Sequence, residues 1–183
     1  MPNNTKHHDM LTQYKVPRWS DFPAIDLYMD QVVELLNFWL DDLYFDSKKP
    51  CITPSMINNY VKSSIVKPPV KKRYTNYHLA FLYVVMVLKQ CFMLQDISDM
   101  IGIYYSMDHT LHTEAHFNKF AEIFEQMLPQ QMTTGKIEDI QFDPPNWQTD
   151  LMINVLKTVC CRLCSMSILA DSREDKRTME ENL

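Results

Sequence analysis

The stretch that decides the fold is TPSMINNYVKSSIVKPPVKKRYT, residues 53–75. Thr53 can accept a hydrogen bond from the first turn of a helix. Pro54 can begin that helix, because the first N–H groups of a helix have no partner inside it. The helix is predicted to run to about Ser63. Its apolar residues fall on one side and its serine, asparagine and lysine residues on the other, so one face is expected to be buried.

A basic, extended segment is predicted after this helix. Residues 65–75 contain two adjacent prolines and four cations, and proline is not accommodated inside a helix. We therefore expect two short extended pieces that form a small wing. Thr75 then caps an apolar helix that ends near Met93, and a further short helix is predicted to end at Gly102.

The same region carries an unusual charge. Between Ser47 and Gln95 there are eight basic residues and no Asp or Glu, whereas the whole chain has 18 basic and 23 acidic residues. A segment of +8 therefore lies between flanks that sum to −13, a contrast that the net charge of −5 conceals. Such a block is typical of a nucleic-acid-binding unit that the other helices support.

The flanking segments show helical periodicity. Apolar residues recur at three and four positions from Pro23 to Leu43, which predicts a long first helix. Residues 107–128 predict another helix, 129–145 a polar connection, and Asn146 begins a last long helix whose broad apolar face closes the core or pairs with a second subunit. The predicted division is an N-terminal arm with little regular structure (1–22), the winged region (23–104), a helical support and dimerisation region (105–171) and a flexible charged tail (172–183).

Composition excludes several classes of protein. Two glycines in 183 residues are too few for a glycine-rich phosphate loop, so a nucleotide-hydrolysing enzyme is not expected. The longest apolar run, 79–88, is about half of the roughly 20 residues that span a bilayer, and no secretory signal is recognisable. We expect a cytoplasmic protein with reduced cysteines and no membrane segment. No catalytic constellation and no cofactor site are predicted either, since the one histidine of the basic segment, His78, has no carboxylate there to orient it.

The order of capped helix, proline pair, basic wing and capped helix resembles the DNA-binding domain of the MerR family of transcription regulators. The family's recognition helix resembles Thr53 to Lys62, its Leu-Pro-Pro stretch resembles residues 65–69, and its Arg-Tyr-Ser/Thr motif resembles Arg73-Tyr74-Thr75. From Ile25 onward the chain is also similar to an uncharacterised bacterial domain-of-unknown-function family, the one numbered eighteen thirty-six. The expected fold is all-α, a helical bundle that contains a MerR-like winged helix-turn-helix with a very small β wing.

The MerR resemblance implies a set of DNA contacts. Asparagine and lysine side chains can pair with base edges and phosphates when a helix enters the major groove. The predicted DNA-binding residues are Ser55, Asn58, Asn59, Lys62, Lys67, Lys71, Lys72, Arg73 and Tyr74. The expected partners are duplex DNA and a second copy of the chain. The alternative is a helical adaptor that keeps the winged scaffold and recognises an acidic protein without binding DNA.

A second polar cluster lies further along the chain. His109, His112 and His116 are spaced three and four apart, so on one helix their imidazoles could share a transition metal. An exposed polar stripe is the favoured interpretation, because no second group of ligands is spaced to complete a shell. No metal is therefore predicted. The cysteines at 160, 161 and 164 are likewise interpreted as core residues rather than as a thiol sensor.

Overall fold

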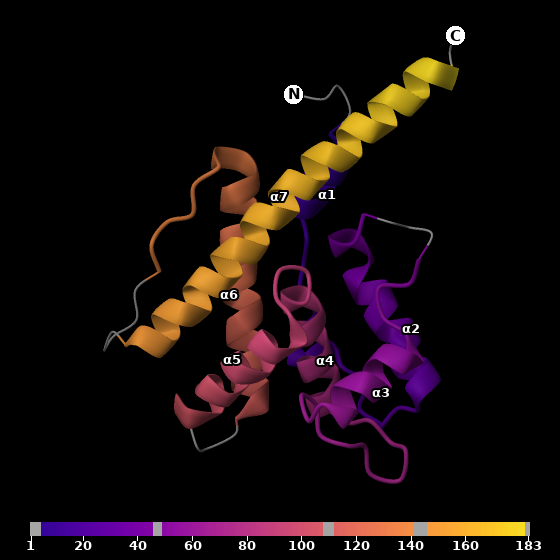
Figure 1. Ribbon diagram of the computed structural model, residues 1–183, viewed down its shortest axis with the longest axis vertical. Coiled ribbons are helices and arrows are strands. Elements are labelled where there is room, and N and C mark those ends of the chain that lie inside the picture. Colours follow the sequence, from indigo (N-terminus) through magenta and orange to yellow (C-terminus); the bar gives the residue numbers. More distant parts are fainter. Residues whose placement is uncertain (1–4, 46–48, 108–111, 141–145, 182–183) are drawn as a thin grey trace.

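A computed structural model describes residues 5–45, 49–107, 112–140 and 146–181, and these residues form a bundle of helices (Figure 1). These ranges contain two isolated β-bridges and no strand, so the predicted all-α class is confirmed. The elements are α1 (Lys6–Thr12), the 3-10 turn η1 (Trp19–Asp21), α2 (Met29–Leu40), the 3-10 turn η2 (Asp41–Leu43), α3 (Pro54–Lys62), α4 (Asn76–Leu88), α5 (Leu94–Met107), α6 (Thr113–Thr134) and α7 (Trp147–Glu181).

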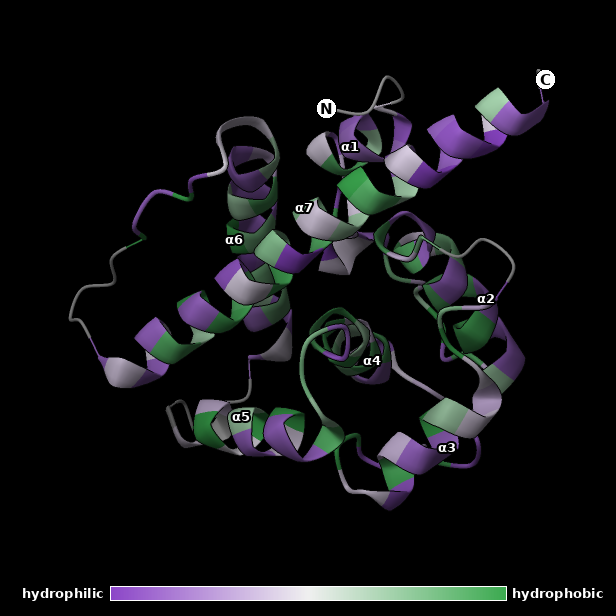
Figure 2. Cartoon of the chain, turned by 45° about the horizontal axis from the view of Figure 1, so that its top comes forward, coloured by the Kyte–Doolittle hydropathy of each residue, from purple (hydrophilic) through white to green (hydrophobic). Residues whose placement is uncertain are grey.

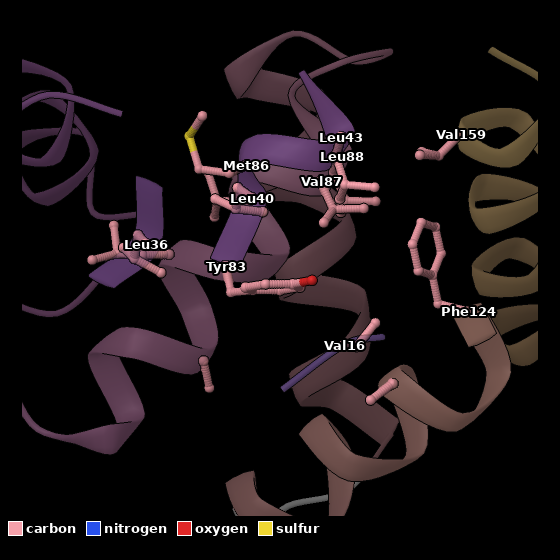
Figure 3. Packing of buried hydrophobic residues seen from close by; sticks show 14 of the residues in the cluster. Val16, Leu36, Leu40, Leu43, Tyr83, Met86, Val87, Leu88, Phe124 and Val159 are labelled. Atoms are coloured by element: carbon pink, nitrogen blue, oxygen red, sulfur yellow. The ribbon is translucent and has the colours of Figure 1, made fainter. Parts of the chain in front are cut away.

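Helix α4 lies at the centre of the bundle, with the other helices around it (Figure 2). Nine of its 13 residues are buried. A helix that is apolar around its whole circumference must be covered on all sides. Figure 3 shows how this happens: α2 contributes Leu36 and Leu40, while Phe124 of α6 and Val159 of α7 lie on another side of α4.

Helix α3 begins as its sequence predicts. The backbone N–H of Met56 donates to the Thr53 hydroxyl at 3.3 Å, and Pro54 occupies the first helical position. Ile57 and Tyr60 are buried, which fixes the apolar side of α3 against the rest of the bundle. The opposite side is therefore presented to solvent.

The predicted wing is smaller than two extended pieces. Val70 and Arg73 form an isolated antiparallel bridge, with the Arg73 N–H donating to the Val70 carbonyl at 2.9 Å. Lys71 and Lys72 between them have φ values of 51° and 62°, so both adopt the left-handed conformation of a type I′ hairpin turn. Most L-residues avoid this conformation, at a cost of about 1 kcal/mol each. We call residues 70–73 the basic turn.

The first long helix is shorter than predicted. Residues 23–28 lie outside α2, because Leu27 forms an antiparallel bridge with Tyr74 in which each N–H donates to the other carbonyl at 2.8 Å. An extended residue at this position cannot be helical, so α2 begins at Met29. This bridge attaches the end of the basic turn to the segment before α2.

Two predicted helix ends were wrong. Gly102 lies inside α5, which continues to Met107, and Pro129 lies inside α6, which ends at Gly135 with φ of 67°. A proline in a helix interior costs about 3 kcal/mol. Burial of Leu128 and Met132 on either side of Pro129 is worth a similar amount, which explains why the helix continues.

Residues 6–12 and 172–181 are helical, where an irregular arm and a flexible tail were predicted. Asp171 of α7 is buried, and its carboxylate accepts hydrogen bonds from the backbone N–H groups of His7 at 2.9 Å and His8 at 3.3 Å. These N–H groups belong to the first turn of α1 and have no partner inside that helix. The side chain of α7 therefore caps α1, and α7 continues past this contact to Glu181.

Helix α7 is also the element that, by length and composition alone, could cross a membrane, among the helices that the structure describes. Lys157 and Arg162 interrupt its apolar run, so a search for uninterrupted apolar stretches does not detect it. In the bundle, 39% of its most apolar 18-residue window is buried. Asn146 caps its start as predicted, since its side-chain oxygen accepts from the Thr149 N–H at 2.8 Å.

Candidate nucleic-acid interface

The polar face of α3 lines an open depression of about 550 Å³. Four of the predicted DNA-binding residues meet there: Ser55, Asn58, Asn59 and Lys62 are all exposed and line it together. The rest of the lining consists of Met56 and Tyr60 of α3, Lys89, which follows α4, and Leu94, the first residue of α5. The structure thus adds Lys89 to the predicted set, and its place in the acid-free segment is the sequence signal that could have identified it. We call this surface the α3 depression.

The basic turn follows α3 at the same end of the molecule, away from α6 and α7 (Figures 1 and 2). Lys71 and Lys72 at its tip are both exposed. Lys67, earlier in the same loop, places its ammonium group 5.0 Å from the centre of the Tyr77 ring, within the range of a cation–π contact. That contact holds the base of the loop on the first turn of α4.

Arg73 is directed away from the tip of the turn. Its guanidinium carbon lies 3.6 Å from the centre of the Tyr28 ring, and its Nη1 donates to the Asp26 carbonyl at 3.3 Å. The side chain is half-buried against the segment before α2. Arg73 therefore stabilises the basic turn internally and is not among the residues that line the α3 depression.

Tyr74 does not fit its predicted role. Its side chain is only 3% exposed, and burial raises the pKa of its hydroxyl. Its backbone is fully used in the bridge to Leu27. The ring packs edge-on against His78 with centroids 5.3 Å apart, so Tyr74 joins the end of the basic turn to α4 and offers no surface to DNA.

Five lysines of the α3 depression and of the loop between α3 and α4 carry uncompensated charge. Lys62, Lys67, Lys71, Lys72 and Lys89 form no ion pair with any carboxylate in the described part of the chain. Some cations elsewhere are paired: Arg18 and Lys15 lie 2.9 Å and 3.7 Å from Glu125. Positive charge without nearby acids attracts a polyanion most strongly, because no internal pair has to be broken first.

His78 has a structural position at the start of α4. The Thr75 backbone N–H donates to its Nδ1 at 2.9 Å, and the Thr75 hydroxyl lies 3.0 Å from the same atom. Burial lowers the pKa of this imidazole, although the carbonyls of Pro68 and Lys67 act in the opposite direction. A neutral ring at this position accepts the N–H of Thr75 and keeps the capping arrangement closed.

The predicted histidine stripe is only partly within the described residues, since His109 lies outside them. His112 precedes α6 and is exposed, whereas His116 is half-buried with its ring 5.0 Å from that of Tyr104. A different group could hold a metal ion: one ligand atom each from His7, Asp171 and Glu174 lie within 4.8 Å of one another. Sequence spacing could not find this group, because its members come from opposite ends of the chain.

The Asp171 carboxylate of this group already has hydrogen-bond partners. Asp171 accepts the two N–H groups of α1, and its Oδ1 lies 2.8 Å from His7 Nδ1. The capping of α1 therefore accounts for the burial of Asp171 without an ion. The group is structural in this protein.

The fold and the surface together define a class: an all-helical protein that presents a polar, cationic helix and a tight basic turn on one end. The chain belongs to the family described as Domain of unknown function (DUF1836), whose model matches residues 17–125, or 109 of the 183 residues. The match includes η1, α2, α3, α4, α5 and the first part of α6, and hence the whole basic surface. No curated protein and no solved structure matches the chain.

Proposed function

We propose that this protein is a cytoplasmic DNA-binding transcription regulator of MerR-like type, which binds duplex DNA as a homodimer through α3 and the basic turn. One observation carries the proposal. The exposed polar side chains of α3 converge with Lys89 on one open surface, while the opposite side of the same helix is buried. A merely solvated helix face does not require its amides and ammonium groups to share a depression.

The dimensions of α3 suit a major groove. An α-helix is about 10–12 Å across with its side chains, which fits a groove about 12 Å wide, and the nine residues of α3 give a length of about 13 Å along it. Asn58 and Asn59 can each offer an amide to the edge of an adenine, and Lys62 can reach a guanine or a phosphate. We therefore assign the recognition of base sequence to Asn58 and Asn59, and the sequence-independent attraction for DNA to the lysines.

The basic turn supplies contacts to the DNA backbone. Two adjacent exposed lysines on a type I′ turn project from a fixed backbone, since the Val70–Arg73 hydrogen bond closes the turn. Lysine acts on phosphate as a point charge and needs no particular side-chain geometry. Contacts of this kind fix the orientation of the protein on the duplex without reading sequence.

Dimerisation is assigned to α7. Ile168, Leu169 and Met179 are exposed apolar residues on its second half, and the C-terminal end of the helix extends past α1 (Figure 1). A two-fold pair would present two copies of α3 to one duplex, about 34 Å apart if they occupy successive major grooves. Sedimentation of Leu169→Lys against wild type tests this part, with a monomeric variant as the expected result.

The decisive experiment is selection of binding sites from a random duplex pool, followed by anisotropy titrations. Asn58→Ala should change the preferred sequence, whereas Lys71→Ala should weaken binding to all sequences alike. Absence of binding to any duplex at 50 mM salt would contradict the proposal.

A second function is favoured by one observation. Arg73 lies on Tyr28 and not on the α3 depression, and Val70 beside it is 72% exposed. Arg73, Tyr28 and Val70 thus form a patch apart from the α3 depression, and its combination of a cation with apolar groups suits an acidic protein partner. A helical adaptor would bind such a partner with Arg73→Ala abolishing the contact and Asn58→Ala leaving it unchanged.

A further inference from the structure

A second site lies within the helical bundle, between α4, α5, α6 and α7. It is a partly open cavity of about 240 Å³ whose walls are almost entirely apolar. Its walls include Phe81 and Val84 from α4, Met100 and Tyr104 from α5, Phe120 from α6 and Met152 from α7.

The size of this cavity sets it apart from an ordinary packing defect. Protein interiors contain few voids larger than a water molecule, and an empty cavity lowers stability in proportion to its volume. An apolar cavity of about 150 Å³ remains dry and holds benzene. The present cavity is larger by about half, so scaling from the six carbons of benzene predicts a ligand of about ten non-hydrogen atoms.

The chemistry of the walls selects a neutral molecule. A charged group enters apolar surroundings only at a high cost unless it is paired. Lys119 is the lysine of the lining. Its side chain is exposed and its ammonium group is 3.2 Å from the Glu122 carboxylate, so this charge lies at the rim of the cavity and is already paired. Four of the lining residues are aromatic, Phe81, Tyr104, Phe117 and Phe120, and aromatic rings pack well on one another in offset or edge-to-face contacts.

We propose that this cavity binds a neutral aromatic molecule of about ten non-hydrogen atoms, of the size of a fused two-ring compound, and that occupancy changes the geometry of the α3 depression. The second half of the proposal rests on the proposed DNA-binding function. The proposed binding of a ligand in the cavity does not depend on DNA binding.

Two elements join the cavity to the α3 depression. Leu88 lines the cavity and the next residue, Lys89, lines the depression. Helix α5 contributes Leu94 to the depression at its first residue and Met100 to the cavity two turns later. A ligand in the cavity that contacts α5 therefore fixes the α5 residues of the cavity and of the α3 depression at the same time. This follows because a helix moves as a rigid body.

Indole, with nine non-hydrogen atoms, is a suitable soluble probe. Isothermal titration of the full chain should give one site with a dissociation constant on the order of 0.1 mM, as expected for so few atoms. Val84→Phe adds a ring to the cavity wall and should weaken indole binding at least tenfold. Val33→Phe makes the same change at a partly buried position of α2 that does not line the cavity, so it should bind indole as wild type does.

A second variant keeps the test valid if Val84→Phe does not fold. Met152→Ala enlarges the cavity and should bind a larger three-ring compound more tightly than wild type binds it. Absence of saturable indole binding to wild type, or binding by folded Val84→Phe as tight as wild type, would overturn the cavity assignment. Both readouts are independent of DNA.

The coupling is tested separately. Saturating indole should change the affinity of wild type for its selected duplex at least threefold and leave that of Val84→Phe unchanged. Indole binding without any change in DNA affinity would overturn the coupling alone. If wild type binds indole but no duplex, the proposed function fails, and hydrogen exchange of α5 then reports the coupling: unchanged protection of residues 94–107 would overturn it.

Discussion

The charge of the basic turn can be tested by replacing Lys71 and Lys72 with alanine together. Each phosphate that a protein neutralises contributes about −0.9 to the slope of log affinity against log salt. If the five unpaired lysines of the surface each meet a phosphate, the slope for one DNA-binding unit is about −4.5. The double variant retains three contacts, so its slope should be about −2.7.

The difference is large enough to measure by fluorescence anisotropy. For one DNA-binding unit on a duplex with a single half-site, wild type should lose affinity about 500-fold between 50 and 200 mM salt, whereas the double variant should lose about 40-fold. The titrations use one labelled duplex and a salt series at constant pH. Thermal unfolding should show no loss of stability, because both side chains are exposed and alanine removes only surface charge.

A matched control separates contact from net charge. Lys176 and Arg177 are exposed cations near the end of α7, at the opposite end of the molecule from the basic turn (Figure 1). Replacing both with alanine changes the net charge by the same amount and should leave the slope at about −4.5. Equal slopes for wild type and the basic-turn variant, or equal reductions in both variants, would refute the assignment of phosphate contacts to the turn.

Three further predictions concern the bundle. Asp171→Ala removes the acceptor of two α1 N–H groups and should lower the free energy of unfolding in urea by about 2–4 kcal/mol; a loss below 0.5 kcal/mol would show that α1 does not depend on it. Burial lowers the pKa of His78, so the unfolded chain binds a proton before the native state does. The contribution of His78 to stability should be present above about pH 6.5 and lost as the pH falls below it, and this loss should be smaller in His78→Gln by urea titration at several pH values. Tyr14→Phe deletes a hydroxyl that donates to the Trp39 carbonyl at 2.6 Å and lies 2.6 Å from the Tyr83 hydroxyl, which should cost about 1–3 kcal/mol; an unchanged denaturation midpoint would mean that water replaces it.

Local chemistry explains which parts of the fold were predictable. The hydroxyl of Thr53 and the ring of Pro54 act within one helical turn, and the structure places α3 where they indicate. The same is true of Asn146 at the start of α7. A capping interaction involves neighbours in sequence, so its energy can be judged from the sequence itself.

Helix ends that depend on distant partners were not predictable. Pro129 and Gly102 are strong local signals for an end, yet both lie inside helices. Burial of residues beyond Pro129 offsets the local cost, and that burial depends on how α6 packs against other helices. Helix α1 likewise needs Asp171, a residue 164 positions from His7.

The same reasoning separates the members of the candidate interface. The helical period placed Ser55, Asn58, Asn59 and Lys62 on one face, and the structure confirms that they are exposed together. The fate of residues 73 and 74 depends on tertiary contacts with Tyr28 and Leu27, which precede them by more than 40 positions. A charge block therefore predicts that a surface is cationic, but only the packing decides which of its cations remain at the surface.

The end of α4 with the residue after it, and helix α5, border both the cavity and the α3 depression. A helix buried on all sides cannot shift toward an empty space without losing contacts elsewhere, and Tyr83 and Met86 of α4 are fully buried. The response to a ligand in the cavity must then be taken up by α5, which lies at the edge of the bundle (Figure 2). Because Leu94 of α5 and Lys89 both line the α3 depression, movement of α5 changes the width of the surface proposed to receive DNA while α3 itself stays fixed. A bound ligand would thus alter affinity more than sequence preference, and site selection with and without indole distinguishes the two effects.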